Sequence, residues 1–518
     1  MSKISLSYSG AVEVFEPMEK KLDETRVAFR NSLGKEWANK IGGQLCRDGT
    51  TYEIRSPADS DVLLGTFIDA SEEAVGRAVR AARDASSSWE RLGWRERVTL
   101  LRRVAGEIDA RMAQLAWASV LEVGKSRVGA LGEVLESIEL IEYYCSQMDR
   151  NEGYTFPLSE TSNELSINTQ RPYGVFGIIA PFNFPIALSA GMLGAALVTG
   201  NSVVFKPSPG AGLSGSLLTE AFEAADLPKG VFNLVCGPNA GQRLVDAPGV
   251  DGIAFTGSHK AGMEINRRMK CGPFARPVIA EMGGKNPVYV TASADLPIAT
   301  KAVLRSAFGL QGQVCTACSV AFVHEDLHDG FIGDLTSALQ GLTFGDVSDR
   351  QTTDGPLINE AAYHRFRNAV EEAKAIGALV TGGDRLSGGI FERGYYVRPA
   401  IVTDLPERHR LFEEELFSPI LAVRRFTSLD QALEYGNAAP LGLAAAFYGK
   451  DHSEIDLFLE RAEAGVLAVN RATGATTGAW PGRQSFCGWK GSGLTGKGGL
   501  GPNFVPQFMR EQSRTFQR

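Results

Sequence analysis

Residues 174–257 contain four short apolar runs, which read GVFGIIAP (174–181), NSVVFKP (201–207), GVFNLVCG (230–237) and DGIAFTG (251–257). Three stretches with a helical pattern separate them, at 185–198, 211–225 and 240–246. Short apolar strands that alternate with helices are typical of βαβ units, which build parallel sheets. The pattern therefore predicts an α/β domain of the nucleotide-binding kind in this part of the chain.

The segments before this region predict helices and then a hairpin. Ser71 is a good N-cap, acidic residues follow it in the first turn, and apolar residues recur at 74, 75, 78, 79, 82 and 85. Further helical pattern extends to about residue 148. Residues 150–171 are polar and β-prone without a helical period. We expect them to form a hairpin that leaves the main body and serves as an oligomerisation arm.

The segments after this region repeat the alternation and end in a tail. A second set of alternating strands and helices runs from 287 to about 470, and a Gly-rich stretch follows at 474–503. The tail FVPQFMREQSRTF (504–516) is β-prone. At the other end of the chain, residues 1–40 are polar with weak periodicity, and we interpret them as an N-terminal extension.

Length and composition indicate a globular protein of two or three domains. The 518 residues are 44% hydrophobic and 22% charged, so the chain can bury a large core. The net charge of −7 arises from scattered charges and leaves no basic stripe for a nucleic acid. No apolar run is long enough for a membrane span, and the N-terminus lacks the features of a signal or transit peptide. We therefore expect a cytoplasmic protein, with no membrane partner, that binds small molecules and copies of itself.

Cys315 is the first candidate for chemistry. It stands among small residues in GLQGQVCTACS (309–319), where a substrate can reach a thiol, although a lone cysteine is more often an inert buried residue. Cys315 and Cys318 also form a CxxC pattern, which occurs in redox pairs and in half zinc sites. No second Cys or His pair accompanies it, so we expect no metal. Seven cysteines in all, an odd and scattered number, indicate reduced thiols rather than a disulfide framework.

Two polar residues beside glycines or aromatics are further candidates. Glu281 precedes two glycines in EMGGKNP (281–287), where backbone can approach a ligand closely and a carboxylate can act as a base. The alternative interpretation is that Glu281 is a surface residue on a loop. Asn183 lies between aromatics in PFNFP (181–185), where a buried amide needs a hydrogen-bond partner or a ligand oxygen. Its alternative is a simple turn.

Residues suited to a dinucleotide follow two of the apolar runs. Gly257, Ser258 and Gly262 lie between a strand and a helix in FTGSHKAGM (255–263), so backbone N–H groups can face a pyrophosphate. Lys206 lies at the carboxyl end of the strand in VVFKPSP (203–209), on the side where open α/β sheets bind ligands. A solvated lysine is the alternative.

In this order the motifs resemble the aldehyde dehydrogenase superfamily: PFNFP (181–185), KPS (206–208), FTGS (255–258), EMGGK (281–285), GQVC (312–315) and EELFSP (414–419). The resemblance extends from about residue 45 to the end of the chain. It implies an α/β fold with a Rossmann-like dinucleotide-binding domain (41–149 and 172–282), an α/β catalytic domain (283–485) and a small β oligomerisation element (150–171 and 496–518). It also implies a homo-oligomer built from dimers.

The resemblance implies NAD(P)-dependent oxidation of an aldehyde to a carboxylic acid through a cysteine thioester. Cys315 is then the nucleophile, Glu281 the general base, and Asn183 with the Cys315 N–H the oxyanion hole. The implied cofactor contacts come from eight residues: Phe182, Lys206, Ser208, Gly257, Ser258, Gly262, Glu415 and Phe417. The cofactor is NAD, with NADP as an alternative, because Pro209 stands where many NAD-preferring members carry a Glu that repels a 2′-phosphate. Two further departures are Phe182 in place of Trp and Cys487 in place of Gly.

Within the superfamily the chain is most similar to L-glutamate γ-semialdehyde (1-pyrroline-5-carboxylate) dehydrogenases. A hydroxyl residue follows the nucleophile, TGA (477–479) matches the loop that holds the α-carboxylate, and the chain closes with PNFVPQFMREQSRTF (502–516). The implied substrate contacts are Phe184, Thr316, Gly478, Ala479 and Phe486. Three alternatives stay open: another aromatic or aliphatic aldehyde, a CoA-acylating enzyme, which generally lacks the Glu at 281, and a catalytically silent relative.

Overall fold

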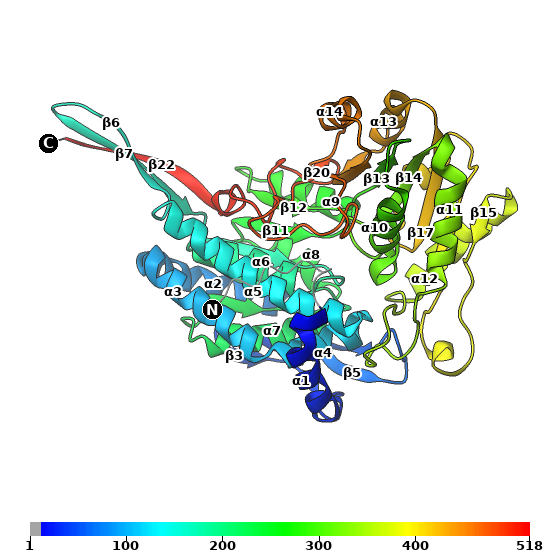
Figure 1. Cartoon of the computed structure of the whole chain (residues 1–518). Coiled ribbons are helices and arrows are strands. Elements are labelled where there is room, and N and C mark those ends of the chain that lie inside the picture. The colour runs from blue at the N-terminus through cyan, green and yellow to red at the C-terminus, as the bar shows by residue number, and fades with distance from the viewer. Residues whose placement is uncertain (1–11, 518) are drawn as a thin grey trace.

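The four apolar runs form parallel strands of one sheet in the computed structural model, which describes residues 12–517 (Figure 1). These strands are β8 (Val175–Ile179), β9 (Ser202–Lys206), β10 (Phe232–Leu234) and β11 (Gly252–Thr256). The full order of this first seven-stranded sheet is β12-β11-β8-β9-β10-β2-β3, completed by β12 (Val278–Glu281) and by antiparallel β2 (Asn39–Ile41) and β3 (Gln44–Cys46). The chain winds to one side of β8 and then to the other. A switch point, where such sheets bind ligands, therefore lies between β8 and β11.

Helices cover the first sheet at the positions that the sequence predicts. They are α2 (Glu72–Arg91), α3 (Trp94–Ala110), α4 (Met112–Val123), α5 (Arg127–Arg150), α6 (Ala187–Val198), α7 (Gly212–Ala224), α8 (Ala240–Asp246) and α9 (His259–Lys270). In α2 the Ser71 hydroxyl accepts a 3.0 Å hydrogen bond from the Ala74 N–H, and all six predicted apolar positions are buried. Three more strands, β1 (Glu36–Trp37), β4 (Gly49–Arg55) and β5 (Leu63–Ala70), form a separate small sheet.

The second alternating set forms another seven-stranded sheet, in the order β15-β16-β17-β14-β13-β19-β20. Its strands are β13 (Asn286–Val290), β14 (Cys318–His324), β15 (Leu379–Thr381), β16 (Ala400–Val402), β17 (Ile420–Phe426), β19 (Ala444–Tyr448) and β20 (Val466–Val469). Its helices are α10 (Leu296–Phe308), α11 (Glu325–Leu339), α12 (Glu360–Ala375), α13 (Leu429–Asn437) and α14 (His452–Arg461). Because β12 ends at Glu281 and β13 begins at Asn286, a four-residue link carries the chain from the carboxyl edge of the first sheet to the amino edge of the second.

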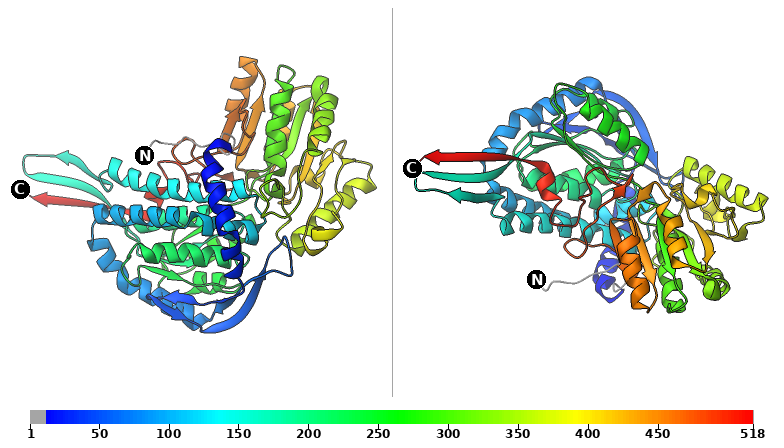
Figure 2. Two further views of the ribbon diagram at one scale, coloured as in Figure 1. Left: turned by 60° about the horizontal axis from the view of Figure 1, so that its bottom comes forward. Right: turned by 90° about the horizontal axis from the view of Figure 1, so that it is seen from above.

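The expected hairpin projects from the body as β6 (Thr155–Glu160) and β7 (Glu164–Pro172), and the C-terminal strand β22 (Met509–Gln517) pairs with β7 along its whole length (Figures 1 and 2). The predicted arm segment 496–518 begins too early. Residues before Met509 belong to the body, because Phe504 and Phe508 are buried in the core of the first sheet and its helices. Residue 518 lies outside the described residues.

The N-terminal extension contains a helix that the weak periodicity did not reveal. Helix α1 (Val12–Asn31) packs across α4 and α5 (Figure 2), and its Phe15, Leu22 and Phe29 side chains are buried in the main core. The first 11 residues of the predicted extension lie outside the described residues.

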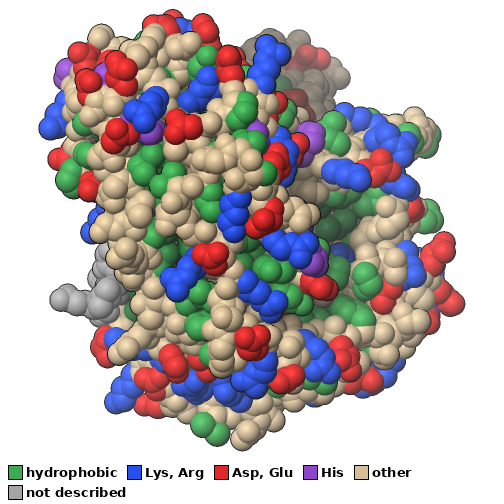
Figure 3. All heavy atoms as spheres, turned by 90° about the vertical axis from the view of Figure 1, so that its right-hand side faces the viewer, with side chains coloured by type: hydrophobic (Ala, Val, Ile, Leu, Met, Phe, Trp, Pro, Cys, Tyr) green, Lys and Arg blue, Asp and Glu red, His purple; other side chains and the backbone are tan. Residues whose placement is uncertain are grey.

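The surface and the helices bear on the expected partners. Acidic and basic side chains are interspersed over the face shown in Figure 3, without a broad patch of one sign. Within residues 12–517, none of the helices is both long enough and apolar enough to cross a membrane. In the same part of the chain, no group of three or more His, Cys, Asp and Glu side chains is placed to hold a metal ion.

Short connecting elements complete the chain. Four 3₁₀ turns are η1 (Gly309–Gly312), η2 (Gly389–Arg393), η3 (Arg410–Phe412) and η4 (Val505–Phe508), and a two-stranded ladder joins β18 (Leu441–Gly442) to β21 (Trp489–Lys490). The turn η1 is the one that matters for the site, because it leads directly to Cys315.

Candidate active site

Four of the predicted site segments meet at the carboxyl edge of the first sheet. Phe182 and Asn183 follow β8, Lys206 ends β9, Gly257 follows β11 and Glu281 ends β12. These strands are parallel neighbours, in the order β12-β11-β8-β9, so their carboxyl ends lie side by side. Parallel pairing thus brings together residues that are up to 99 positions apart in the sequence.

Cys315 lies at the facing amino edge of the second sheet, three residues before β14 begins. The chain reaches it through η1, in which Leu310, Gln311 and Gly312 all have positive φ, at 51°, 56° and 65°. A Cβ on Gly312 would lie 2.6 Å from the Ser418 carbonyl, so glycine is required at this point of the turn. The left-handed turn presents Cys315 to the edge of the first sheet.

Asn286, at the start of β13, holds the nucleophile turn from the other side. Its side-chain Nδ2 donates hydrogen bonds of 2.9 Å to the carbonyls of Cys315 and Ala317, and its Oδ1 accepts one of 2.9 Å from the Ala444 N–H. The residue is fully buried. Asn286 belongs to the EMGGKNP motif, but its role was not predicted from the sequence, because its partners lie about 30 and 160 residues away.

Asn183 reaches the same turn from the first sheet. Its Nδ2 donates a 2.9 Å hydrogen bond to the carbonyl of Gln313, two residues before the cysteine, and the side chain is only 4% exposed. A side-chain amide carries two N–H donors, so one remains for a ligand oxygen. Asn183 thus lies in a bend after β8 with its side chain buried against the nucleophile turn.

Burial shifts the pKa of both predicted catalytic groups. It raises the pKa of the Cys315 thiol to about 12, and the carboxylates of Glu415 and Glu281 act in the same direction. Burial also raises the pKa of Glu281 well above its usual range, against a hydrogen bond from the Gly488 backbone. The Glu281 Oε2 has no hydrogen-bond partner in the described structure. Glu281 is therefore not the exposed loop residue of the alternative interpretation.

One cavity of about 340 Å³ is lined by two of the catalytic candidates and by the whole predicted substrate set. Its wall includes Cys315 and Glu281 together with Phe184, Thr316, Gly478, Ala479 and Phe486. A volume in this range suits a small-molecule substrate. A further lining residue is Lys125, which forms a buried 2.6 Å ion pair with Glu133 and lies 3.7 Å from the centre of the Phe184 ring. No motif in the sequence marked this pair.

The loop that carries Gly478 is tied to the nucleophile turn. The Thr476 hydroxyl donates a 2.6 Å hydrogen bond to the carbonyl of Thr316, the residue after the nucleophile. Arg471 donates from Nη1 to the Thr477 carbonyl at 3.0 Å. Gly478 itself has φ of 102°, which L side chains rarely adopt. The loop therefore has a defined conformation beside Cys315.

Five of the predicted cofactor residues lie along the carboxyl edge of the first sheet. Lys206 is 6% exposed, and burial lowers the pKa of its ammonium to about 8. Ser258 is the N-cap of α9, where its hydroxyl accepts a hydrogen bond from the Ala261 N–H. A Cβ on Gly262 would lie 2.4 Å from the Met282 sulfur, so glycine at this position lets α9 pack closely against the residue that follows β12. Ser208 and Gly257 lie in the two turns that follow β9 and β11.

The other three predicted cofactor residues, Phe182, Glu415 and Phe417, lie between the two sheets. The Glu415 Oε1 accepts a 2.9 Å hydrogen bond from the Gly284 N–H, and burial raises the pKa of Glu415 to about 7. The rings of Phe182 and Phe417 meet edge to face with centroids 5.9 Å apart. Phe417 has φ of 54°, an uncommon conformation for an aromatic residue. Phe182 and Phe417, two of the predicted cofactor residues, are thus in contact.

Comparison with known proteins agrees with this geometry. The sequence pattern described as "Aldehyde dehydrogenase family" matches residues 46–513. The chain belongs to the aldehyde dehydrogenase family. The match covers every predicted catalytic and cofactor residue, whereas α1 lies outside it.

Named relatives and solved structures cover almost all of this aldehyde dehydrogenase. The 1-pyrroline-5-carboxylate dehydrogenase of Bacillus subtilis (strain 168) is 34% identical over 495 residues, 94% of each chain. The structure of 1-pyrroline-5-carboxylate dehydrogenase from Thermus with bound NAD has a TM-score of 0.93 and 28% identity, and covers 98% of this chain and 99% of that one. Proline utilization A (PutA) from Bdellovibrio bacteriovorus has a TM-score of 0.91 and 31% identity, and the match takes 96% of this chain but 51% of that chain. This chain spans about half the length of that last protein.

Proposed function

We propose that this aldehyde dehydrogenase oxidises L-glutamate γ-semialdehyde to L-glutamate with NAD, through a thioester on Cys315. The observation that carries the proposal is the single cavity that places the Cys315 thiol and the Glu281 carboxyl beside the 477–479 turn, between Phe184 and Phe486. The similarity to proteins named 1-pyrroline-5-carboxylate dehydrogenase supports the same substrate.

Cys315 is the nucleophile in this proposal. Its thiol must lose a proton before the sulfur attacks the aldehyde carbon, and its raised pKa means that a base or a change in the surroundings has to assist. Attack turns the aldehyde oxygen into an oxyanion bonded to the carbon that now carries sulfur.

Asn183 and the Cys315 N–H stabilise this oxyanion. The second N–H of the Asn183 amide is the donor, because the first is occupied by the Gln313 carbonyl. Asn286 holds the Cys315 carbonyl, which belongs to the peptide after the nucleophile, and so helps to order the turn that carries the Cys315 N–H. Loss of one such donor typically costs about 3–4 kcal/mol of transition-state stabilisation.

The residues at the edge of the first sheet fit a dinucleotide. A buried ammonium at Lys206, a capped helix N-terminus at Ser258 and a buried carboxylate at Glu415 are the donors and acceptors that two riboses and a pyrophosphate require. When bound, NAD accepts the hydride that leaves the carbon. We propose that residues 41–149 and 172–282 form the domain that binds it, and residues 283–485 the catalytic domain.

Glu281 then takes the proton of the water that hydrolyses the thioester. Its raised pKa makes the carboxylate a stronger base than an exposed Glu, which suits proton transfer near neutral pH. The water oxygen bonds to the acyl carbon, the carbon–sulfur bond breaks, and the free acid leaves. The presence of Glu281 in the cavity favours this outcome over transfer to coenzyme A.

The 477–479 turn is our proposed site for the α-carboxylate of the substrate. Backbone N–H groups beside the positive-φ Gly478 form a concave set of donors of the kind that binds anions without an arginine. Thr476 ties this turn to Thr316, so the carboxylate and the reacting carbon are held at a fixed separation. Phe184 and Phe486 line the cavity and would contact the methylene groups between them.

Assembly and compartment are proposals of the same kind. Phe156, Leu158 and Phe516 are 43–50% exposed on the projecting three-stranded sheet, which supports a homo-oligomer built from dimers through this arm. The interspersed charges in Figure 3 support small molecules rather than nucleic acid as ligands, and the scattered free thiols support a reducing, cytoplasmic compartment.

The test is NADH formation with L-glutamate γ-semialdehyde, pentanal and propanal, each with and without coenzyme A. We expect the highest kcat/KM for the semialdehyde and no dependence on coenzyme A. Cys315→Ala should abolish turnover and leave NAD binding nearly unchanged, whereas Cys318→Ala should retain substantial activity, because Cys318 is buried at the start of β14. Equal and total loss in both variants would favour a CxxC redox mechanism, and a higher kcat/KM for pentanal would exclude the proposed substrate.

A further inference from the structure

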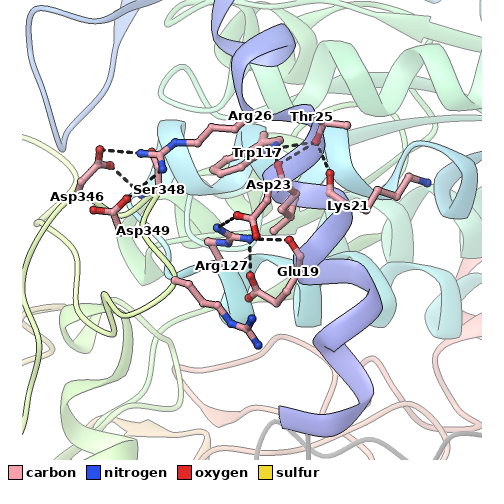
Figure 4. Close-up of polar contacts among 12 residues, drawn as sticks. Glu19, Lys21, Asp23, Thr25, Arg26, Trp117, Arg127, Asp346, Ser348 and Asp349 are labelled. Carbon is pink, nitrogen blue, oxygen red and sulfur yellow. Dashed lines mark hydrogen bonds and ion pairs between the residues drawn. The ribbon is translucent and has the colours of Figure 1, made fainter.

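Helix α1 is fastened to one wall of the substrate cavity. That wall includes residues 124–126 and 128–129, at the end of α4 and the start of α5, and Arg127 lies between them without lining the cavity. The buried Arg127 donates to the Asp23 carboxylate at 2.6 Å and to the Glu19 carbonyl at 2.7 Å, and also forms a 2.6 Å ion pair with the Glu19 carboxylate (Figure 4). The Trp117 Nε1, from α4, donates to the Leu22 carbonyl and the Thr25 hydroxyl, both at 3.2 Å.

The same helix is fastened to a loop of the second half of the chain. Arg26 pairs with Asp349 at 3.0 Å and with Asp346 at 3.3 Å, and Figure 4 shows its guanidinium between the two carboxylates. Arg30 pairs with Asp346 at 3.3 Å and donates to the Ser348 hydroxyl at 2.9 Å. Arg350 pairs with Glu16. All these contacts lie on the tip of one loop, residues 346–350.

This loop leads directly to a second part of the cavity wall. Its base is closed by hydrogen bonds from the N–H groups of Thr353 and Asp354 to the Thr343 carbonyl, and Thr353 and Gly355 line the cavity. A Cβ on Gly355 would lie 1.9 Å from the Gly124 carbonyl, so the two walls are in direct backbone contact. The Val347 side chain of the loop is fully buried in the same core as α1.

The segment that carries Thr353 and Gly355 is also hydrogen-bonded to the nucleophile turn. The Gln313 Oε1 accepts a 2.9 Å hydrogen bond from the Ile358 N–H, and the Gln313 carbonyl accepts the hydrogen bond from Asn183. The loop tip on α1 and the turn that presents Cys315 are therefore separated by a few residues of ordered chain. A displacement of the 343–358 segment would alter the cavity width and the surroundings of Gln313 together.

We propose that α1 is a strap that holds the two walls of the aldehyde cavity together, and that Arg26 and Arg30 are positioning residues for the reaction. The proposal rests on the proposed function only in taking this cavity as the aldehyde site. Helix α1 lies outside residues 46–513, the part matched by the family pattern. Each of its ion pairs with the loop is partly exposed and is weakened by salt, whereas the Arg127 contacts are buried.

The experiment compares the double variant Arg26→Gln/Arg30→Gln with the wild type. We expect the KM for the aldehyde to rise about threefold to tenfold. The KM for NAD should change less than about twofold, because the cofactor residues are not in contact with the strap. Raising NaCl from about 0.05 M to about 0.5 M should raise the aldehyde KM more in the wild type than in the double variant, which retains the Arg350–Glu16 pair. Backbone hydrogen exchange of residues 353–358 should be faster in the double variant.

Arg461→Gln is the matched control. Arg461 also bridges two carboxylates, Asp430 and Glu434, with a side chain 34% exposed against 31% for Arg26, but on helices α13 and α14. Its aldehyde KM and its exchange at 353–358 should stay at wild-type values. Glu16→Gln is a milder second variant, because it removes the Arg350–Glu16 contact and leaves Arg26 and Arg30 in place. A smaller rise in the same KM is expected for it.

The strap is overturned if the double variant keeps the wild-type KM for the aldehyde and the wild-type exchange at 353–358. Propanal is used alongside the semialdehyde for every measurement. If the wild type does not prefer the semialdehyde, the substrate proposal fails, while the change in KM for propanal still decides the strap. An equal rise in the KM for NAD and for the aldehyde would indicate general loosening of the fold and would also overturn it.

Discussion

The side-chain amide of Asn286 lies 2.9 Å from the backbone carbonyl of Cys315 and donates a hydrogen bond to it. The contact fixes the peptide group of the nucleophile at the point where the second sheet begins. The site therefore depends on a buried amide that is itself neither a predicted cofactor residue nor a predicted substrate residue.

Asn286→Asp should lower kcat/KM for every aldehyde by about tenfold to a hundredfold, because a carboxylate cannot donate to the two carbonyls that Asn286 now holds. The KM for NAD should be almost unchanged. Steady-state kinetics with two aldehydes, together with a thermal unfolding curve, checks this. Asn437→Ala is the control, since Asn437 also joins two backbone groups but does so beside α14. Wild-type activity in Asn286→Asp would show that the Cys315 peptide is positioned without it.

Glu281→Gln should give a pre-steady-state burst of about one NADH per active site and then stall, because hydride transfer precedes deacylation. The steady rate should fall by about a hundredfold or more. In the wild type the rate of deacylation should rise with pH, because the base works only when deprotonated and the pKa of Glu281 lies above its usual range. The variant should show no such rise. Stopped-flow absorbance at several pH values measures both effects, and normal steady turnover would exclude Glu281 as the essential base.

NADP should be accepted as a second cofactor, because Pro209 places no carboxylate near a 2′-phosphate. Pro209→Glu should raise the KM for NADP about tenfold or more and leave the KM for NAD almost unchanged. The preference should also depend on pH. Lys206 is protonated below its pKa of about 8, so binding of the extra phosphate should weaken as the pH rises through that value. Pro209→Ala is the control for loss of the proline ring. If the wild type discriminates against NADP relative to NAD by about a thousandfold or more, the argument from Pro209 is wrong.

Local sequence signals predicted the elements that depend on local chemistry. Ser71 caps α2, Lys206 ends a buried strand, and the polar stretch after Arg150 forms the hairpin. Ordered motifs predicted the catalytic trio and the cofactor residues, and the structure places Cys315 and Glu281 on one cavity. These features follow from patterns a few residues long.

Contacts between distant segments could not be predicted in the same way. In α1 the apolar positions Phe15, Leu22 and Phe29 lie at helical spacing but are few among polar residues, and their burial is decided by α4 and α5. The roles of Asn286 and Thr476 depend on single hydrogen bonds to partners that only the folded chain brings near. For the same reason the start of the C-terminal strand was misplaced, because burial of Phe504 and Phe508 is a tertiary property.

Gly478→Val should lower kcat/KM for glutamate semialdehyde by about tenfold to a hundredfold and that for propanal much less. The reason is the backbone rather than space. A Cβ on Gly478 would meet only the Arg471 Nη1, at 3.7 Å, an ordinary contact, so crowding of the donors does not explain the effect. The φ of 102° is strained for valine, and the turn must rearrange to relieve that strain. Its N–H groups then no longer converge on the α-carboxylate, an anion that propanal lacks.

Gly388→Val is the matched control, because Gly388 has φ of 87° and a Cβ at this position would have nothing within 4 Å. Gly388 is far from the cavity residues in sequence and does not line the cavity. It carries the same backbone strain, and it should lower thermal stability without changing the ratio of kcat/KM for the two aldehydes. That ratio is the deciding measurement. If Gly478→Val reduces kcat/KM equally for both aldehydes, or if the wild type prefers pentanal, the α-carboxylate site is wrong, while the roles of Cys315 and Glu281 would still stand on their own tests.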